Sequence, residues 1–361
     1  MFLLFSSLSV LASINPNSQL TAKSAYQFNS ELSNQAIQPP YTSNYLVIFP
    51  KNTESFNSYP TTIGGGSFFV QNISCTYETC YSNYNPYNKD IYTVAAGIGE
   101  LLMINSSNEI QHKITSVQLK FITFDPQNGN IYATNCLNNE VCIYSQSLSL
   151  LHRIPVSSGP TGIVFDPVNG YVFVSHYKNP QINVIASNGT FVTNLSLPNG
   201  FSDEFSQDIY DPLNKEVYIA EAQSTAVGLI TGINSSVSIN VSIPLNFEPS
   251  GLTVDTFNGY LCVGSLIVTE AFALNQSGSL EDCIHLPSCP SSTIFDPYNN
   301  YTYFTMTSGC VAVINQTYNM VADPFVGSFP RGIGYSPATN DLYISNGGSS
   351  TIQFHLEDLH W

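Results

Sequence analysis

A short turn sequence occurs seven times along this chain of 361 residues. In its fullest form it reads Asp-Pro-x-Asn-Gly, as at residues 166–170, and an alternating apolar run follows each copy. The copies begin at Asn85, Asp125, Asp166, Asp211, Asp255, Asp296 and Ser336. Their second residues are 40, 41, 45, 44, 41 and 40 positions apart. A period in the low forties indicates a repeated unit of several short strands.

The residue types of this turn explain how the chain reverses. The first aspartate can accept backbone N–H groups, and the proline fixes φ near the value that the next position needs. Asparagine and glycine at the fourth and fifth positions tolerate the left-handed conformation that closes a short β-loop. We therefore expect each turn to join the first and second strands of a unit. The turn aspartates are then structural.

Seven units of this length predict an all-β fold, a seven-bladed β-propeller with four antiparallel strands in each blade. No unit shows the i, i+3, i+4 apolar spacing of a helix, which argues against a solenoid. In the third blade the strands are expected at 161–166, 171–176, 181–186 and 191–197. The last blade lacks a fourth strand before Trp361, whereas residues 67–73 form a strand pattern ahead of the first turn. This N-terminal strand is predicted to close blade seven.

The repeat resembles the YVTN-type β-propeller family, with its NHL-like relatives, whose unit reads roughly Pro-x-Gly-Ile-x-Phe-Asp-Pro-x-Asn-Gly-x-Val-Tyr-Val. Residues 160–174 match this unit nearly throughout, and residues 330–344 match it well. Blade five has Thr256 in place of the proline, and blade one lacks the Gly-Ile entry. The resemblance implies a secreted or cell-surface propeller of archaeal type. It implies no single function, because such propellers are surface proteins, binding modules and a few enzymes.

Three parts of the chain are expected. Residues 1–13 are apolar and end in small residues, like the remnant of a secretory signal peptide, and are too short to span a bilayer. Residues 14–64 form an N-terminal extension, or arm, with one strand pattern at 44–50. Residues 65–361 form the propeller, with 65–73 as its closing strand. The arm either packs on its own propeller or adds a strand to a neighbouring subunit.

Charged residues are scarce, at 9% of the chain, and the net charge is −16 with only nine Lys or Arg. The absence of a basic patch argues against binding to nucleic acid. Asn, Ser, Thr and Tyr replace the missing charges, so the surface changes little when carboxylates are protonated near pH ~4. This composition favours an acidic habitat, with compositional drift as the alternative.

Sequons and cysteines indicate an extracellular protein. Nine Asn-x-Ser/Thr sequons are candidate N-glycosylation sites: Asn72, Asn105, Asn188, Asn194, Asn234, Asn240, Asn275, Asn300 and Asn315. Eight cysteines show no zinc spacing. The predicted disulfides are Cys75–Cys80, Cys136–Cys142 and Cys289–Cys310, all on one rim. Cys262 and Cys283 are expected to lie too far apart to pair, and Cys283–Cys289 is the rival pairing.

Candidate ligand-binding residues lie where loops should meet at the channel mouth. The residue that ends each second strand is expected to line the channel, and among these only His176 and Glu221 are suggestive. The connection 199–211 adds Asp203, Glu204 and Asp208, which could bind Ca²⁺ or form a solvated acidic loop. His176 is expected to be a solvated channel histidine. No catalytic residue, metal site or cofactor is predicted.

The sequence therefore predicts a non-enzymatic extracellular structural or interaction protein of the cell surface. It is expected to be glycosylated and to self-associate through its arm or to bind other surface proteins. It is not expected to bind nucleic acid or to span a membrane. The alternative is a channel-mouth ligand binder, or a lactonase-like or lyase-like propeller enzyme, using His176, Glu221 and the 199–211 loop.

Overall fold

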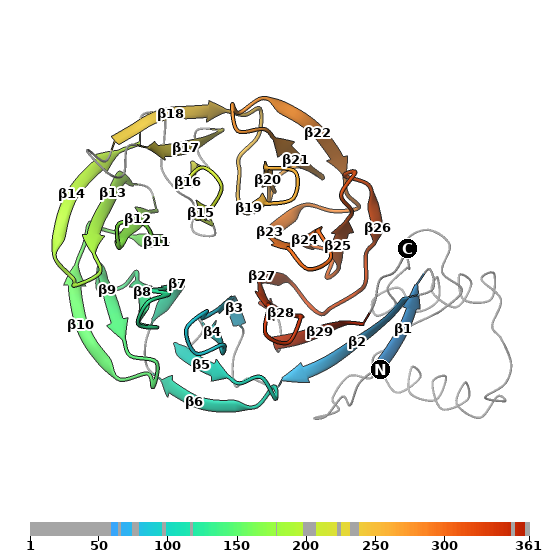
Figure 1. Ribbon diagram of the computed structural model, residues 1–361, viewed down its shortest axis with the longest axis horizontal. Coiled ribbons are helices and arrows are strands. Elements are labelled where there is room, and N and C mark those ends of the chain that lie inside the picture. Colours follow the sequence, from blue (N-terminus) through green and yellow to red (C-terminus); the bar gives the residue numbers. More distant parts are fainter. Residues whose placement is uncertain are drawn as a thin grey trace, which may run out of the picture. The chain divides into compact units, whose positions relative to one another are not determined.

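The computed structural model describes residues 59–63, 66–73, 79–95, 99–115, 118–177, 179–197, 207–221, 225–231, 238–347 and 351–357. These residues belong to one compact unit, 57–361. They contain no helix and form antiparallel sheets arranged around a central axis (Figure 1). The described part of the chain is thus a β-propeller.

Six sheets have four strands each, and we call them blades 1 to 6 in chain order. Blade 1 contains β3 (Thr79–Tyr84), β4 (Ile91–Ala95), β5 (Glu100–Ile104) and β6 (Ile110–Thr115). Blade 2 contains β7 (Leu119–Phe124), β8 (Ile131–Asn135), β9 (Glu140–Tyr144) and β10 (Leu150–Pro155). Blade 3 contains β11 (Pro160–Asp166), β12 (Tyr171–His176), β13 (Asn179–Ala186) and β14 (Phe191–Ser196).

The second half of the chain continues this pattern. Blade 4 contains β15 (Ile209–Asp211), β16 (Glu216–Glu221), β17 (Ala226–Thr231) and β18 (Ser238–Pro244). Blade 5 contains β19 (Leu252–Asp255), β20 (Tyr260–Val263), β21 (Glu270–Leu274) and β22 (Leu280–His285). Blade 6 contains β23 (Pro290–Asp296), β24 (Tyr301–Met306), β25 (Val311–Ile314) and β26 (Met320–Ala322). The four strands of a blade are called A to D from the centre outward.

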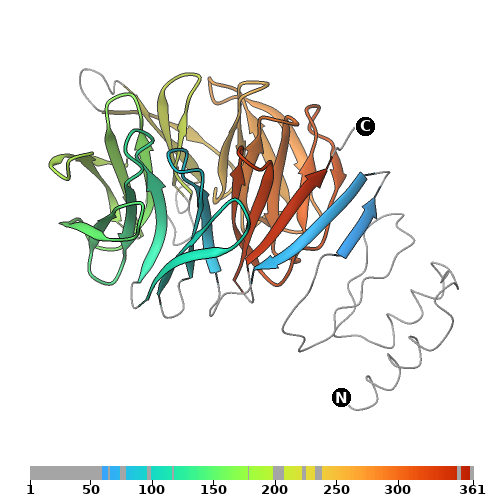
Figure 2. The same ribbon diagram turned by 60° about the horizontal axis from the view of Figure 1, so that its bottom comes forward.

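The remaining sheet has five strands and departs from the predicted four-stranded form. Its order is β1 (Tyr59–Ile63), β2 (Gly66–Ile73), β29 (Thr351–Glu357), β28 (Asp341–Asn346) and β27 (Pro330–Ser336). β2 pairs antiparallel with β29 from Ser67–Glu357 to Ile73–Thr351, and the two strands lie side by side in both views (Figure 2). β1 pairs with the other edge of β2. The end of the predicted arm therefore forms a strand of this sheet, while residues 14–58 lie outside the described residues.

The repeated turn has the same conformation in all seven copies. The first side chain caps it, as when Asp166 Oδ1 accepts the Val168 N–H at 2.8 Å. The fifth residue is the left-handed one, and Gly170 has φ +72°. Asn169 is not left-handed; its Oδ1 accepts the Tyr171 N–H at 2.9 Å. The fifth residues with positive φ are Lys89, Gly129, Gly170, Lys215, Gly259, Asn300 and Asn340. Each turn joins strands A and B, as predicted.

The core lies between neighbouring sheets. One position of strand B supplies most of the largest buried side chains, namely Tyr92, Tyr132, Phe173, Tyr218, Tyr303 and Tyr343. Three of these tyrosines also tie one sheet to the next. Tyr132 Oη donates to Ser187 O of blade 3 at 2.7 Å. The other two bonds run from Tyr92 Oη to Gln146 O (2.8 Å) and from Tyr343 Oη to Asn108 Oδ1 (2.7 Å).

Two rims follow from this topology. The A–B rim contains the turns between strands A and B and between strands C and D. The B–C rim contains the hairpins between strands B and C and the connections from one blade to the next. All the repeated turns therefore lie at one rim.

Candidate functional site

His176 and Glu221 end neighbouring B strands but do not come together. Val172 and Val174 pack in a cluster with blade 2, so His176, on the same face of β12, also points toward blade 2. Val217 and Ile219 pack against blade 3, so Glu221 points toward blade 3. The predicted pair is thus divided between two interfaces, with blade 3 between them.

His176 is fully buried, which contradicts the expectation of a solvated channel histidine. Burial lowers the pKa of its imidazole to about 4, although the Asn183 side chain and the backbone at Ser157 and Ser158 favour the charged form. Neither ring nitrogen makes a hydrogen bond. A neutral, enclosed imidazole of this kind is a core residue of the interface.

Glu221 is also fully buried. A Cβ at Gly228 of the neighbouring strand would lie 2.7 Å from Glu221 Oε1 and 3.0 Å from Leu197 of blade 3. The missing side chain at Gly228 therefore makes the space that this carboxylate occupies. Glu221 fills a gap between blades 3 and 4.

The whole ring of B-strand ends differs from the prediction. All seven residues are buried, and Met306 packs in a core cluster of blades 5 and 6. The ring comprises Ala95, Asn135, His176, Glu221, Ser265, Met306 and Asn346. Met306 thus faces a neighbouring sheet, whereas Asn135 and Ser265 make hydrogen bonds within their own blades. The burial of all seven side chains argues against the expectation that they line an open channel.

The centre of the ring is occupied by Gln207, which precedes β15. Its N–H donates to Ser250 O of blade 5 at 2.8 Å, and its Oε1 accepts the Ser292 hydroxyl of blade 6 at 3.0 Å. Its side chain is also hydrogen-bonded to Tyr81 of blade 1. Gln207 and Tyr81 are each 8% exposed. Gln207 thus connects blade 4 to three other blades, to blade 5 through its backbone N–H and to blades 6 and 1 through its side chain.

Asp208 lies beside this contact, between blades 3 and 4. Its Oδ2 accepts the Ser175 hydroxyl at 2.5 Å, while Oδ1 has no hydrogen-bond partner. Burial raises the pKa of Asp208 to about 7, although Ser175 and the Ala220 N–H favour the ionised form. A Cβ at Gly162 would lie 2.1 Å from Oδ2 and 2.4 Å from the Ser175 hydroxyl oxygen. The carboxyl group therefore requires glycine at 162.

Of the predicted acidic loop, only Asp208 is described, since Asp203 and Glu204 lie outside the described residues. Sequence reasoning did not identify Gln207 or Tyr81. A usable signal existed, because counting back from the turn places Tyr81, Phe121 and Gln207 at the same repeat position as three glycines. Those glycines are Gly162, Gly251 and Gly332. The large residues belong to blades 1, 2 and 4, and the glycines belong to blade 3, blade 5 and the five-stranded sheet.

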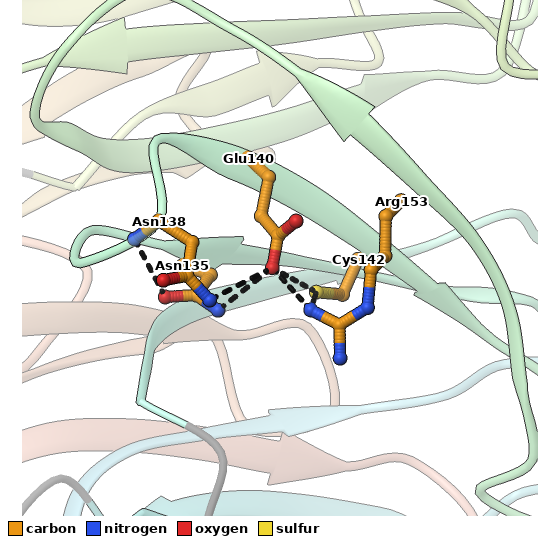
Figure 3. Close-up of polar contacts among 5 residues, drawn as sticks. All are labelled: Asn135, Asn138, Glu140, Cys142 and Arg153. Atoms are coloured by element: carbon orange, nitrogen blue, oxygen red, sulfur yellow. Dashed lines mark hydrogen bonds and ion pairs between the residues drawn. The ribbon is translucent and has the colours of Figure 1, made fainter.

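A polar cluster that the sequence did not reveal surrounds Glu140 on blade 2 (Figure 3). Glu140 Oε1 forms an ion pair with Arg153 and accepts Asn135 Nδ2 at 3.0 Å and Asn138 Nδ2 at 3.3 Å. The Cys142 thiol donates to the same oxygen at 3.6 Å. Burial and Glu140 raise the pKa of Cys142 to about 11. A protonated thiol is a poor nucleophile. The cluster therefore holds the outer strands of blade 2 together.

The predicted Cys136–Cys142 disulfide is not formed. Neither cysteine belongs to a disulfide, and Cys142 faces Ala133 in the ladder. Cys136 is three positions further along, about 10 Å away, whereas a disulfide joins Cα atoms less than about 7 Å apart.

Cys289 and Cys310 are also free thiols. Cys289 O accepts the Thr307 N–H and Cys310 O accepts the Met306 N–H, so the end of β24 lies between them. Two strand spacings are about 10 Å, again beyond disulfide reach. Cys262 and Cys283 are likewise free, and Cys75 lies outside the described residues.

The sequons of the C–D turns lie at the A–B rim. Asn105, Asn275 and Asn315 each begin the turn after strand C, and the exposed Asn188 lies in the same turn of blade 3. Asn194 is exposed on β14, and Asn300 is the half-buried left-handed residue of its turn. Asn72 and Asn240 lie on β2 and β18, and Asn234 lies outside the described residues.

Within the described ranges, no group of three or more His, Cys, Asp or Glu is arranged to hold a metal ion. The same ranges contain no helix long and apolar enough to cross a membrane.

Comparison with known proteins shows the fold. No protein-family model matches the chain, and no curated protein matches it. Among solved structures it is similar to a streptogramin B lyase, at 14% identity and a TM-score of 0.69, covering 80% of this chain and 98% of that one.

Two further structures are similar to the chain. Virginiamycin B lyase from Staphylococcus aureus has 14% identity and a TM-score of 0.66, covering 80% of this chain and 100% of that one. The RRP9 WD40 repeats have 11% identity and a TM-score of 0.68, covering 83% of this chain and 100% of that one. At these identities the likeness shows only that this chain has the β-propeller fold.

Proposed function

We propose that the protein is a non-enzymatic structural or interaction protein of the cell surface, which self-associates through its N-terminal arm. The observation that carries this proposal is a set of apolar side chains on the A–B rim, at the third position of the repeated turn. Their exposure is between 46% and 71%. The set, called the apolar ring below, comprises Tyr87, Val168, Leu213, Phe257 and Tyr298. Large exposed apolar patches are typical of interaction sites.

We also propose that the five-stranded sheet is the seventh blade of a YVTN-type propeller of archaeal type. Its innermost strand, β27, packs against both β3 and β23. The Ser345 hydroxyl of this sheet lies 2.6 Å from the Ser82 hydroxyl of blade 1. These contacts support a ring closed through β2 and β29.

An extracellular, glycosylated protein of an acidic habitat is the setting we propose. Exposed Asn188 and Asn194 support glycosylation, because a glycan at either would meet solvent. Raised carboxyl pKa values support the acidic habitat. Burial raises the pKa of Asp208 to about 7 and that of Asp323 to about 6. Such groups favour the folded state most when they are protonated.

Sedimentation velocity of the secreted, full-length protein over a wide concentration range tests self-association. We expect species heavier than the 39.5 kDa chain with its glycans, in proportions that increase with concentration. A single monomeric species at every concentration would contradict the proposal.

A channel ligand binder, or a lactonase-like or lyase-like enzyme, is the second candidate. Asp208 favours it, because a buried carboxyl with a raised pKa beside a channel is typical of functional sites. The contacts of Gln207 across the centre disfavour it, since they occupy the space that a ligand would need. Saturable ligand binding by a monomeric protein, lost in Asp208→Asn, would support this candidate instead.

A further inference from the structure

The turns that carry the apolar ring have two exposed charged side chains, Lys89 and Lys215. The turn carboxylates below the ring are buried, with Asp125, Asp166, Asp211, Asp255 and Asp296 at most 4% exposed. The neighbouring amides are engaged within the blades, as when Asn299 Nδ2 donates to Tyr303 Oη and Asn214 Nδ2 donates to Tyr218 Oη, each at 2.8 Å. The five side chains of the ring are apolar and exposed, so an occupant of this ring should be mainly apolar.

One segment of the chain itself meets this description. The charges of residues 1–58 cancel, because Lys23 and Lys51 balance Glu31 and Glu54. The whole net charge of −16 thus belongs to residues 59–361. The neutral segment contains the apolar stretch Tyr45-Leu46-Val47-Ile48-Phe49. It could approach a second, strongly acidic copy without electrostatic repulsion.

Strand direction shows where this segment joins the propeller. Tyr59, at the start of β1, pairs with Val70 near the end of β2, and Ile73 at that end pairs with Thr351. Thr351 in turn pairs with Ser345, near the end of a B strand. Tyr59 therefore lies toward the B–C rim. The segment enters at the rim opposite the apolar ring.

The segment is too short to reach the apolar ring of its own copy. β1 spans about 17 Å between the rims, and four strand spacings of ~4.8 Å separate it from the innermost strand, about 19 Å. A path around the outer edge is therefore about 36 Å long. Nine Cα–Cα steps separate Pro50 from Tyr59, and they extend at most ~32 Å. Docking on the apolar ring thus requires a second copy.

We propose that the apolar ring is the docking surface for residues 44–50 of a neighbouring copy. This inference rests on the proposed self-association and adds its acceptor surface and direction. Copies associate head to tail, with the B–C rim of one molecule facing the A–B rim of the next. Such an interface joins two different surfaces, so it builds filaments or rings and not closed two-fold dimers.

The test uses three full-length double variants. Leu46→Asp with Ile48→Asp disables the docking segment, and Phe257→Asp with Tyr298→Asp disables the apolar ring. Leu137→Asp with Ile267→Asp is the matched control, because these residues are 68% and 59% exposed in B–C hairpins at the opposite rim. Each variant is examined alone by sedimentation velocity, and the first two are also mixed in equal amounts.

We expect the segment variant and the ring variant to be monomeric, and the control to assemble like the wild type. The mixture should form a complex of two copies and no larger species, because it contains one intact segment and one intact ring. This two-copy complex distinguishes head-to-tail docking from general loss of folding.

Other results would overturn the inference. A ring variant that still assembles places the segment elsewhere, for instance on a sheet edge, and leaves the proposed self-association standing. A segment variant that still assembles while the ring variant does not indicates two rings packed face to face. A monomeric wild type would overturn the proposed self-association as well.

Discussion

The absence of a side chain at Gly162 leaves the space that two neighbouring polar groups occupy. The Asp208 carboxyl and the Ser175 hydroxyl both occupy space that a Cβ at this position would fill. The Asp208–Ser175 bond links blade 3 to the segment entering blade 4. Glycine is thus needed here for the neighbour's side chain and not for its own backbone angle.

Gly162→Ala should displace Asp208 and lower the free energy of unfolding by about 1–3 kcal/mol, as overpacked sites do. Thermal denaturation at mildly acidic pH measures this effect. Gly264→Ala is the control, since the nearest atoms to its Cβ would belong to Pro290 and Phe304, at 3.3 Å and beyond. Equal losses in both variants would show that Asp208 is not the cause.

Hydrogen bonds between a strand of one sheet and a turn of the next link neighbouring sheets at the A–B rim. In three sheets the buried tyrosine of strand B extends to the next sheet, where its hydroxyl donates to a C–D turn. Tyr132 makes this bond to Ser187 O at 2.7 Å. Burial raises the pKa of the Tyr132 hydroxyl above its ordinary value. Neighbouring sheets are therefore joined both by apolar packing and by hydrogen bonds such as this one.

Tyr132→Phe removes the hydroxyl and leaves the ring in place. We expect the free energy of unfolding to fall by about 1 kcal/mol, the usual net contribution of one hydrogen bond. Chemical denaturation provides the measurement. Tyr298→Phe should have no effect, because that side chain is 71% exposed. An unchanged free energy of unfolding in Tyr132→Phe would mean that water satisfies the Ser187 carbonyl equally well.

Elements were predictable from the sequence because their signals are local. The turn at 166–170 and the strands beside it were expected within two residues of their observed limits. The direction of side chains was not predictable. Both faces of a blade are buried, so no polar face shows which way His176 or Glu221 points, and a shift of one residue reverses the face.

Contacts that depend on strand register or on distant parts of the chain were also not predictable from the sequence. The Cys136–Cys142 prediction needed the hairpin register, which places Cys142 opposite Ala133. The contact of Gln207 with Ser292 joins residues 85 positions apart, and no short-range pattern encodes it. The five residues of β1 gave too short a pattern to be distinguished from the rest of the arm.

For the whole molecule, burial raises carboxyl pKa values across several blades. Besides Asp208 and Asp323, the pKa is raised for Asp90, Asp166, Asp211, Glu216 and Asp296. A carboxyl group whose pKa is higher in the folded state than in the unfolded state favours folding when it is protonated. Its contribution to the free energy of unfolding is complete below the unfolded-state pKa, near 4, and is lost as the pH rises through the folded-state pKa. His176 acts in the opposite direction, because its lowered pKa costs stability as the pH falls from about 6.5 to about 4.

Carboxyls outnumber the single histidine, so we expect a higher melting temperature at pH 4 than at pH 8. Asp208→Asn should weaken this dependence, because the amide resembles the protonated acid and cannot ionise. Its full contribution is of the order of 4 kcal/mol. Asp282→Asn, at an exposed position of blade 5, is the control. A melting temperature that rises from pH 4 to pH 8 would refute the expectation.

The contact between the Ser82 and Ser345 hydroxyls joins residues 263 positions apart. During synthesis at roughly 5–20 residues per second, the first of them waits about 15–50 s for the second. Throughout that time blade 1 has no neighbour on one side, and β2 has no β29 to pair with. The sheet that contains β2 therefore cannot be completed before β29 has been synthesised. A stop codon before β29 would therefore leave β2 and β28 without the strand that joins them.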